Sequence, residues 1–267
     1  MERALPQLLQ WLLENAPPVK LDWQPLPEPD LIPYQAVNRL PVGSVLVLAP
    51  HPDDEVLGCG GLLALASRDR ADARVVVVSD GGMGGDAAVR EVESRQAAAV
   101  LGYGAVDAAL AFWRLPDRGI VPDETLVARC CSTLRRQRPA WCLAPSPFEV
   151  HPDHIALCRA AIDATARCGV RLGFYEVGQA LMPNLLVDIT SVHDIKRRAL
   201  EGFASQLAQQ RYDEQILALN RFRAYTLGPA VTHAEAYWFP DVADCGDPLA
   251  VLRAAGRLLS KRLGVFE

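Results

Sequence analysis

The sequence predicts an α/β fold built around a mostly parallel sheet, and three observations support this prediction. Continuous apolar runs at 44–49, 74–79 and 141–144 have the pattern of strands buried on both faces. Helical periodicity separates these runs, and strands that alternate with helices form βαβ units. The chain has 267 residues, of which half are hydrophobic and 22% are charged, so it can bury a sizeable core and is not a disordered chain.

The remaining elements follow from local pattern along the chain. Residues 5–15 carry leucines at helical spacing, and prolines at 17 and 18 end that helix. Residues 17–42 hold seven prolines and predict an extended arm. Four body helices are expected at 58–69, 86–102, 123–137 and 154–168. The last hundred residues predict strands at 171–177, 185–189 and 234–239, and helices at 191–209, 211–224 and 247–262. We therefore expect an N-terminal helix and arm over 1–42 and one domain over 43–267.

Composition excludes several classes of protein. The formal charge is 27 − 32 = −5, which argues against a dedicated nucleic-acid binder. No stretch reaches the roughly 18 apolar residues of a transmembrane helix, and the N-terminus lacks the pattern of a signal peptide. The seven cysteines are scattered and form no CxxC pair, which is typical of buried thiols in a reducing compartment. We expect a cytoplasmic protein without an integral membrane segment, and a homo-oligomer is left open.

Two of the five histidines begin closely similar tetrapeptides, His51-Pro52-Asp53-Asp54 and His151-Pro152-Asp153-His154. The first follows a buried strand by two residues, and the second follows the strand that ends near Pro145 by six. In open α/β sheets, ligands bind at the carboxyl ends of the strands. Both tetrapeptides are therefore expected at the edge of the sheet where a site should form.

Two imidazoles and one carboxylate make a three-ligand set that leaves a fourth position open, as in a catalytic zinc site. Positions 1 and 4 of the first tetrapeptide can turn toward one ion, so we expect His51, Asp54 and His154 to bind a metal. Asp53 would then face the open position. Water bound to zinc has a pKa of about 7, and Asp53 could act as the general base. The same ligand set also accepts other first-row metals. A single HPDD is equally explained by an Asp N-cap beside a surface histidine, but two copies at strand ends favour a site.

These motifs resemble a known family. Ser44–Leu63 is similar to the opening of the LmbE-like, or PIG-L, zinc-dependent deacetylases, whose hallmark HPDDE is completed by Glu55. The second hallmark, HPDH, is His151–His154. The supporting segments of this resemblance are Arg90–Glu93 followed by Leu101-Gly102, Val187–Thr190 with Lys196 and Ser205-Gln206, and Ala234–Ala236. The resemblance spans about residues 44–239.

The resemblance implies a Rossmann-like three-layer sandwich and one Zn²⁺ per chain. It implies hydrolysis of the N-acetyl group of an amino-sugar conjugate, such as an N-acetylglucosamine derivative, to give acetate and a free amine. His151 would stabilise the oxyanion or protonate the leaving amine, and Asp153 would orient or charge one imidazole. Arg90 and Asp117 match family positions near the sugar. From their neighbours alone, Arg90 could instead pair with Glu91 or Glu93, and Asp117 could shape a turn.

The sequence departs from the family in two places, and other functions compete. After the second strand it reads SDGGMGG, where many relatives carry an acidic residue after a glycine. Glu149 stands where some relatives use a tyrosine near the oxyanion. A metallo-amidase that cleaves a different acyl group would use the same site. A nucleotide-dependent oxidoreductase would bind its cofactor through the loop at 81–87, although a dinucleotide loop normally follows the first strand. A non-catalytic binding protein on the same fold is the third alternative.

Overall fold

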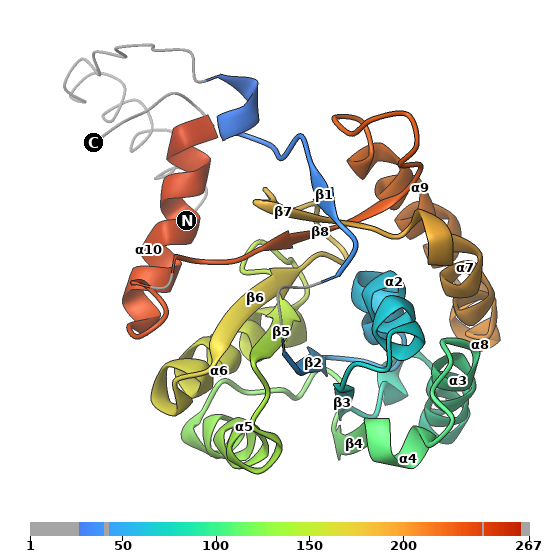
Figure 1. The fold of residues 1–267 in the computed structure, drawn as a ribbon. Coiled ribbons are helices and arrows are strands. Elements are labelled where there is room, and N and C mark those ends of the chain that lie inside the picture. The colour runs from blue at the N-terminus through green and yellow to red at the C-terminus, as the bar shows by residue number, and fades with distance from the viewer. Residues whose placement is uncertain (1–26, 40–42, 242, 263–267) are drawn as a thin grey trace, which may run out of the picture.

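The computed structural model describes residues 27–39, 43–241 and 243–262 (Figure 1). They form an eight-stranded sheet in the order β1-β7-β8-β6-β5-β2-β3-β4. Among these strands, β8 alone runs antiparallel to its neighbours, β6 and β7. The strands are β1 (Ala36–Val37), β2 (Val45–Ala49), β3 (Ala73–Ser79), β4 (Leu110–Leu115), β5 (Trp141–Pro145), β6 (Arg171–Tyr175), β7 (Leu185–Asp188) and β8 (Ala234–Trp238). The predicted α/β class with a mostly parallel sheet is confirmed.

Helices cover both faces of the sheet and make a three-layer sandwich (Figure 1). One face packs against α5 (Glu124–Gln137), α6 (Pro152–Cys168) and α10 (Pro248–Arg262). The other packs against α2 (Asp54–Arg68), α3 (Ala87–Val100), α7 (His193–Glu201) and α9 (Tyr212–Arg223). The short helices are α4 (Val106–Ala109) and α8 (Ala204–Leu207). Strand β2 supplies both layers because its side chains alternate, with Leu46 and Leu48 in the first core and Val45 and Val47 in the second.

The order of the strands reverses between β2 and β5. From β2 the chain proceeds outward through β3 and β4, whereas β5 returns to the opposite side of β2 and continues to β6. Ligands of open α/β sheets bind at such a point, beyond the carboxyl ends of the two central strands. The two predicted tetrapeptides follow β2 and β5, so the topology brings them to this position.

The structure corrects several predicted elements. Helix α2 begins at Asp54 rather than 58, so Asp54 lies in its first turn. Strand β4 was not predicted, because only its first residue is buried and it forms the edge of the sheet without a continuous apolar run. The expected helix at 191–209 is divided into a 3₁₀ turn at Thr190–Val192, then α7 and α8. The short edge strand β1 lies within the predicted arm and pairs with β7. The helix expected at 5–15 lies outside the described residues.

A buried ion pair holds α2 against α7 and β8. Lys196, which is fully buried, donates from Nζ to Glu235 Oε1 at 2.7 Å and to the carbonyl of Leu57 at 2.9 Å. The two carboxylate oxygens of Glu235 accept the backbone N–H groups of Gly61 and Leu62. A Cβ at Gly61 would lie 2.4 Å from the side chain of Ile189, which follows β7. The close approach of α2 to this residue therefore requires glycine. This pair thus fixes the helix whose first turn carries the predicted site.

We expect Lys196→Met to destabilise the fold by about 3–5 kcal/mol, because it leaves the Glu235 carboxylate buried without its cation. Chemical denaturation of the metal-free protein measures the change. Arg197→Met, one residue along on the exposed side of α7, is the control and should change the free energy of unfolding by no more than about 0.5 kcal/mol. Equal stability of the Lys196 variant and wild type would refute a structural role for the pair.

Across the described residues, none of the helices combines the length and the apolar character needed to cross a membrane.

Candidate active site

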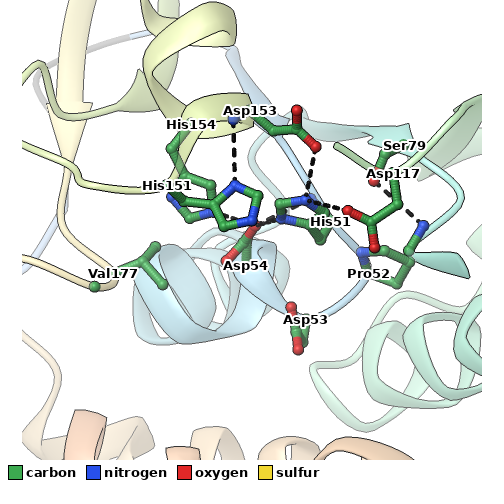
Figure 2. A network of polar contacts seen from close by, with 12 residues as sticks. His51, Pro52, Asp53, Asp54, Ser79, Asp117, His151, Asp153, His154 and Val177 are labelled. Atoms are coloured by element: carbon green, nitrogen blue, oxygen red, sulfur yellow. Dashed lines mark hydrogen bonds and ion pairs between the residues drawn. The ribbon is translucent and has the colours of Figure 1, made fainter. Parts of the chain in front are cut away.

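Three imidazoles from the two tetrapeptides meet above the first turn of α2 (Figure 2). The ring centroids of His51 and His151 are 4.7 Å apart, those of His51 and His154 are 5.3 Å apart, and those of His151 and His154 are 5.2 Å apart. One ring nitrogen of each lies within 4.8 Å of the others. The loops after β2 and β5 therefore converge as predicted, although about a hundred residues separate them in the chain.

One carboxylate oxygen joins two of these rings. Asp54 Oδ2 lies 3.1 Å from His51 Nδ1 and 3.2 Å from His154 Nε2. Two donors that each lie about 2.05 Å from a tetrahedral zinc ion are themselves about 3.3 Å apart, so Asp54 Oδ2 has the spacing of a zinc ligand from each of the two nitrogens. Their chemistry, two imidazole nitrogens and one carboxylate oxygen, also suits zinc. The residues present thus fit the expected metal.

The far nitrogen of His51 faces two more carboxylates. Its Nε2 lies 3.1 Å from Asp153 Oδ2 and 3.2 Å from Asp117 Oδ1. Burial alone would lower the pKa of His51, but the carboxylates of Asp117, Asp153 and Asp54 raise it to about 11. A proton on Nε2 is therefore held by Asp153 and Asp117, which leaves Nδ1 as the nitrogen available to a metal.

Asp153 and His151 have distinct contacts. Besides His51, the Asp153 carboxylate accepts the backbone N–H of Arg118 at 2.7 Å and of Ile120 at 3.2 Å. These contacts support the predicted role of Asp153 in orienting one imidazole, that of His51. His151 is the N-cap of α6, and its Nδ1 accepts the N–H of Asp153 at 3.2 Å. That contact places the ring proton of His151 on Nε2, and burial lowers its pKa, so the ring is a neutral donor.

Asp53 lies apart from the imidazoles in Figure 2, on the side of the site that faces α3. Its φ of 124° is outside the regions favoured by residues other than glycine. The buried Glu55 carboxylate holds this backbone by accepting the Asp53 N–H at 3.0 Å. Burial and the neighbouring Asp54 raise the pKa of Asp53 well above its usual value, and Arg90 opposes them. A carboxylate with a raised pKa is suited to take up a proton near neutral pH.

Arg90 and Asp117, the two predicted sugar-binding residues, make contacts within the protein. Arg90 is buried and donates to the carbonyls of Pro52 and Gly81 and, at 3.2 Å, to Asp53 Oδ2. Asp117 accepts the N–H of Met83 in addition to its contact with His51. His51 holds the pKa of Asp117 at about 2, so this carboxylate is charged. These contacts support positioning roles for both residues, and their contact with a sugar stays a prediction.

Glu149 is a site residue whose role was not predicted. It is buried, and its Oε2 lies 3.3 Å from Nδ1 of His154. Both histidines of the expected ligand set therefore have a carboxylate on the nitrogen that faces away from Asp54. The signal in the sequence was an acidic residue two positions before the HPDH motif.

These contacts predict how metal binding depends on pH. In the metal-free protein, carboxylates raise the pKa of His51 to about 11 and that of His154 to about 9 although burial opposes both, so both rings are charged at neutral pH. A metal needs neutral imidazoles. Binding should therefore release about two protons, and affinity should rise about 100-fold per pH unit between pH 6 and 8. Calorimetry of zinc binding in buffers of different ionisation enthalpy measures this release, and binding without it would contradict the expected ligand set.

Comparison with known proteins agrees with the geometry. Residues 46–165, which include both tetrapeptides, match the family model described as PIG-L, GlcNAc-PI de-N-acetylase. Diacetylchitobiose deacetylase of Thermococcus kodakarensis is 28% identical over 204 residues, which cover 64% of this chain and 73% of that protein.

Two solved structures share the fold. The conserved protein TT1542 from Thermus thermophilus has a TM-score of 0.67 and 29% identity, and the alignment covers 74% of this chain and 95% of that one. N,N'-diacetylchitobiose deacetylase from Pyrococcus horikoshii has a TM-score of 0.68 and 22% identity, with 91% and 94% covered. In its motifs, in the family model over residues 46–165 and in its fold, this chain is similar to PIG-L-type, or LmbE-like, proteins.

Proposed function

We propose that the protein is a zinc-dependent deacetylase that removes an N-acetyl group from an amino-sugar conjugate. The observation that carries the proposal is the position of Asp54 Oδ2 between His51 Nδ1 and His154 Nε2, at 3.1 and 3.2 Å. The family model describes a de-N-acetylase of an N-acetylglucosamine lipid, and the relative from Thermococcus kodakarensis acts on diacetylchitobiose. Both names contain the N-acetyl group of an amino sugar, which is why we propose this substrate class.

The reaction adds water to the acetamide and gives acetate and a free amine. His51, Asp54 and His154 would hold the ion. Zinc supplies Lewis-acid activation of a water molecule and of the amide carbonyl when it is bound. Asp53 would take the proton that the attacking water loses, and its raised pKa suits that step. Arg90 and Glu55 would hold Asp53 in position through their contacts with its side chain and backbone.

His151 would act on the other side of the reacting carbon. Since its Nδ1 accepts a backbone N–H, its Nε2 proton is free to stabilise the negative charge that develops on the amide oxygen. The nitrogen of the amide must gain a proton before it leaves. The proton taken by Asp53 or the proton on His151 can serve, and the two residues are the N-caps of separate helices, α2 and α6.

The loop at 81–87 supports the hydrolase over an oxidoreductase. Backbone amides that would bind a pyrophosphate are already used, since Gly82 N–H donates to Asp80 and Met83 N–H donates to Asp117. Asp86 caps the N-terminus of α3 with its own carboxylate, which would repel a phosphate. The metallo-amidase alternative uses the same residues and differs only in the acyl group released.

Acetate release tests the proposal. The zinc-loaded protein should release equimolar acetate and amine from at least one member of a panel of N-acetylated glucosamine glycosides that includes diacetylchitobiose. A chelator should abolish this release, and added zinc should restore it. N-propionyl and N-acyl analogues in the same panel distinguish a deacetylase from a broader amidase. If the loaded protein hydrolyses none of the amides, the proposed function is wrong.

We also propose a reducing compartment such as the cytoplasm. All seven cysteines lie within the described ranges, and all seven are free thiols. Five of them are buried, which agrees with their use as small core residues.

A further inference from the structure

Glu149 connects a metal-binding histidine to the loop that follows β6. Its carboxylate side chain is only 1% exposed. Oε1 accepts the backbone N–H of Val177 at 2.9 Å and of Gly178 at 3.1 Å. Oε2 lies 3.3 Å from Nδ1 of His154. One buried carboxylate therefore bridges the N-terminal end of α6 and residues 177–179, which belong to a different part of the sheet edge.

The backbone of the loop is adapted to this carboxylate. A Cβ at Gly178 would lie 3.0 Å from Glu149 Oε2, so glycine allows the approach. The N–H of Gln179 adds a third, longer contact at 3.4 Å. Burying a carboxylate costs several kcal/mol unless polar partners satisfy it. The backbone N–H groups of residues 177–179 are its hydrogen-bond donors, and His154 Nδ1 adds an ion-pair contact at 3.3 Å. The arrangement is a built contact and not a chance approach.

The imidazole of His154 lies between two carboxylates. Nδ1 faces Glu149 at 3.3 Å, and Nε2 faces Asp54 at 3.2 Å. A ring proton on Nδ1 faces the Glu149 carboxylate, and the lone pair of Nε2 is then directed toward the position shared with Asp54 and His51. Carboxylates that accept from the outer nitrogen of a metal-bound histidine fix its tautomer and orientation, and their loss typically lowers metal affinity about 10–100-fold.

We propose that Glu149 is a positioning residue of the metal centre, which sets the tautomer and angle of His154 and clamps residues 177–179 against the site. The inference rests on the proposed zinc site and assigns a role to a buried residue outside the two tetrapeptides. Glu149 thereby makes the loop after β6 part of the wall of the site.

The chain offers a matched control on the same loop. Glu176 is also buried, pairs with Arg223 through Nε at 3.0 Å, and accepts the N–H of Leu181 at 3.0 Å. It anchors the loop from the other side, through Arg223 and Leu181. Glu176→Gln therefore weakens the loop without removing a partner of His154.

The experiment compares wild type, Glu149→Gln, Glu149→Ala and Glu176→Gln as full-length chains. Zinc affinity is measured without substrate by competition with a chelator, and hydrogen exchange of the amides at 177–179 is measured in the metal-free proteins. We expect both Glu149 variants to bind zinc about 10–100-fold more weakly. Exchange should accelerate most in Glu149→Ala, because the side-chain amide oxygen in Glu149→Gln can still accept from the loop. Glu176→Gln should also exchange faster but should bind zinc like wild type.

Unchanged zinc affinity in Glu149→Gln would overturn the proposal, and so would an equal loss of affinity in Glu176→Gln, which would assign the effect to the loop. Unchanged exchange in Glu149→Ala would overturn the clamp. Glu149→Gln preserves the shape of the side chain, so the comparison holds even where Glu149→Ala does not fold. The proposed function fails separately, if wild type itself binds no zinc, and the exchange measurement in the metal-free protein is independent of that result.

Discussion

Asp53→Asn is expected to abolish turnover while the protein retains one metal ion per chain. Asparagine has nearly the same shape and can keep a contact with Arg90, but it cannot accept the proton of the attacking water. Loss of a general base typically costs about 10²–10⁴ in kcat. Asp53 is not in the expected ligand set, so its replacement should leave the zinc content unchanged. Acetate release and metal analysis of the same preparation measure the two effects.

Asp86→Asn is a suitable control for this variant. Asp86 caps α3 through its side chain, and asparagine is an equally good N-cap, so turnover should stay at the wild-type level. Wild-type turnover in Asp53→Asn would show that another group is the base. A wild-type protein that binds zinc and the sugar conjugate without releasing acetate would instead favour the non-catalytic binding protein.

His154→Ala is expected to remove most of the bound zinc. The change deletes one of the three expected ligands. The loss of zinc affinity should therefore exceed the roughly 10–100-fold expected when a carboxylate that contacts a ligand histidine, such as Glu149, is removed. Zinc content after gel filtration and affinity by chelator competition measure it. Acetate release should fall with metal occupancy.

His193→Ala is the matched control, because His193 stacks on His233 at 3.7 Å and is not among the residues that form the site. It should bind zinc like wild type. If His154→Ala keeps its full zinc content, His154 does not belong to the ligand set.

The central strands and the convergence of the two tetrapeptides could be predicted because both depend on local patterns. Strands buried on both faces have continuous apolar sequences, and the loops that follow β2 and β5 meet wherever these strands are neighbours. Strand β4 lacked that signal, since an edge strand is covered on fewer sides and Ala111 and Arg114 are exposed. Sequence patterns thus predicted the position of the site more reliably than they predicted the edge strand β4.

The partners of the site residues could not be predicted from spacing, because they depend on contacts between distant elements. Arg90 lies on α3 and reaches the loop before α2, where it holds Asp53. Asp117 follows β4, the strand that was missed, and reaches His51. Glu149 meets residues 177–179 only because β5 and β6 are neighbours. The positive φ of Asp53 likewise arises from the surrounding contacts and not from its residue type.

A single metal position underlies the assigned roles, and anomalous diffraction from crystals of the zinc-loaded protein tests it most directly. We expect one strong peak per chain, at about 2.0–2.2 Å from His51 Nδ1, an Asp54 oxygen and His154 Nε2, with the carboxylate of Asp53 facing the fourth position. A peak held instead by His51 Nε2 with Asp117 and Asp153, or a peak far from both tetrapeptides, would contradict the assignment of the ligands and of the base.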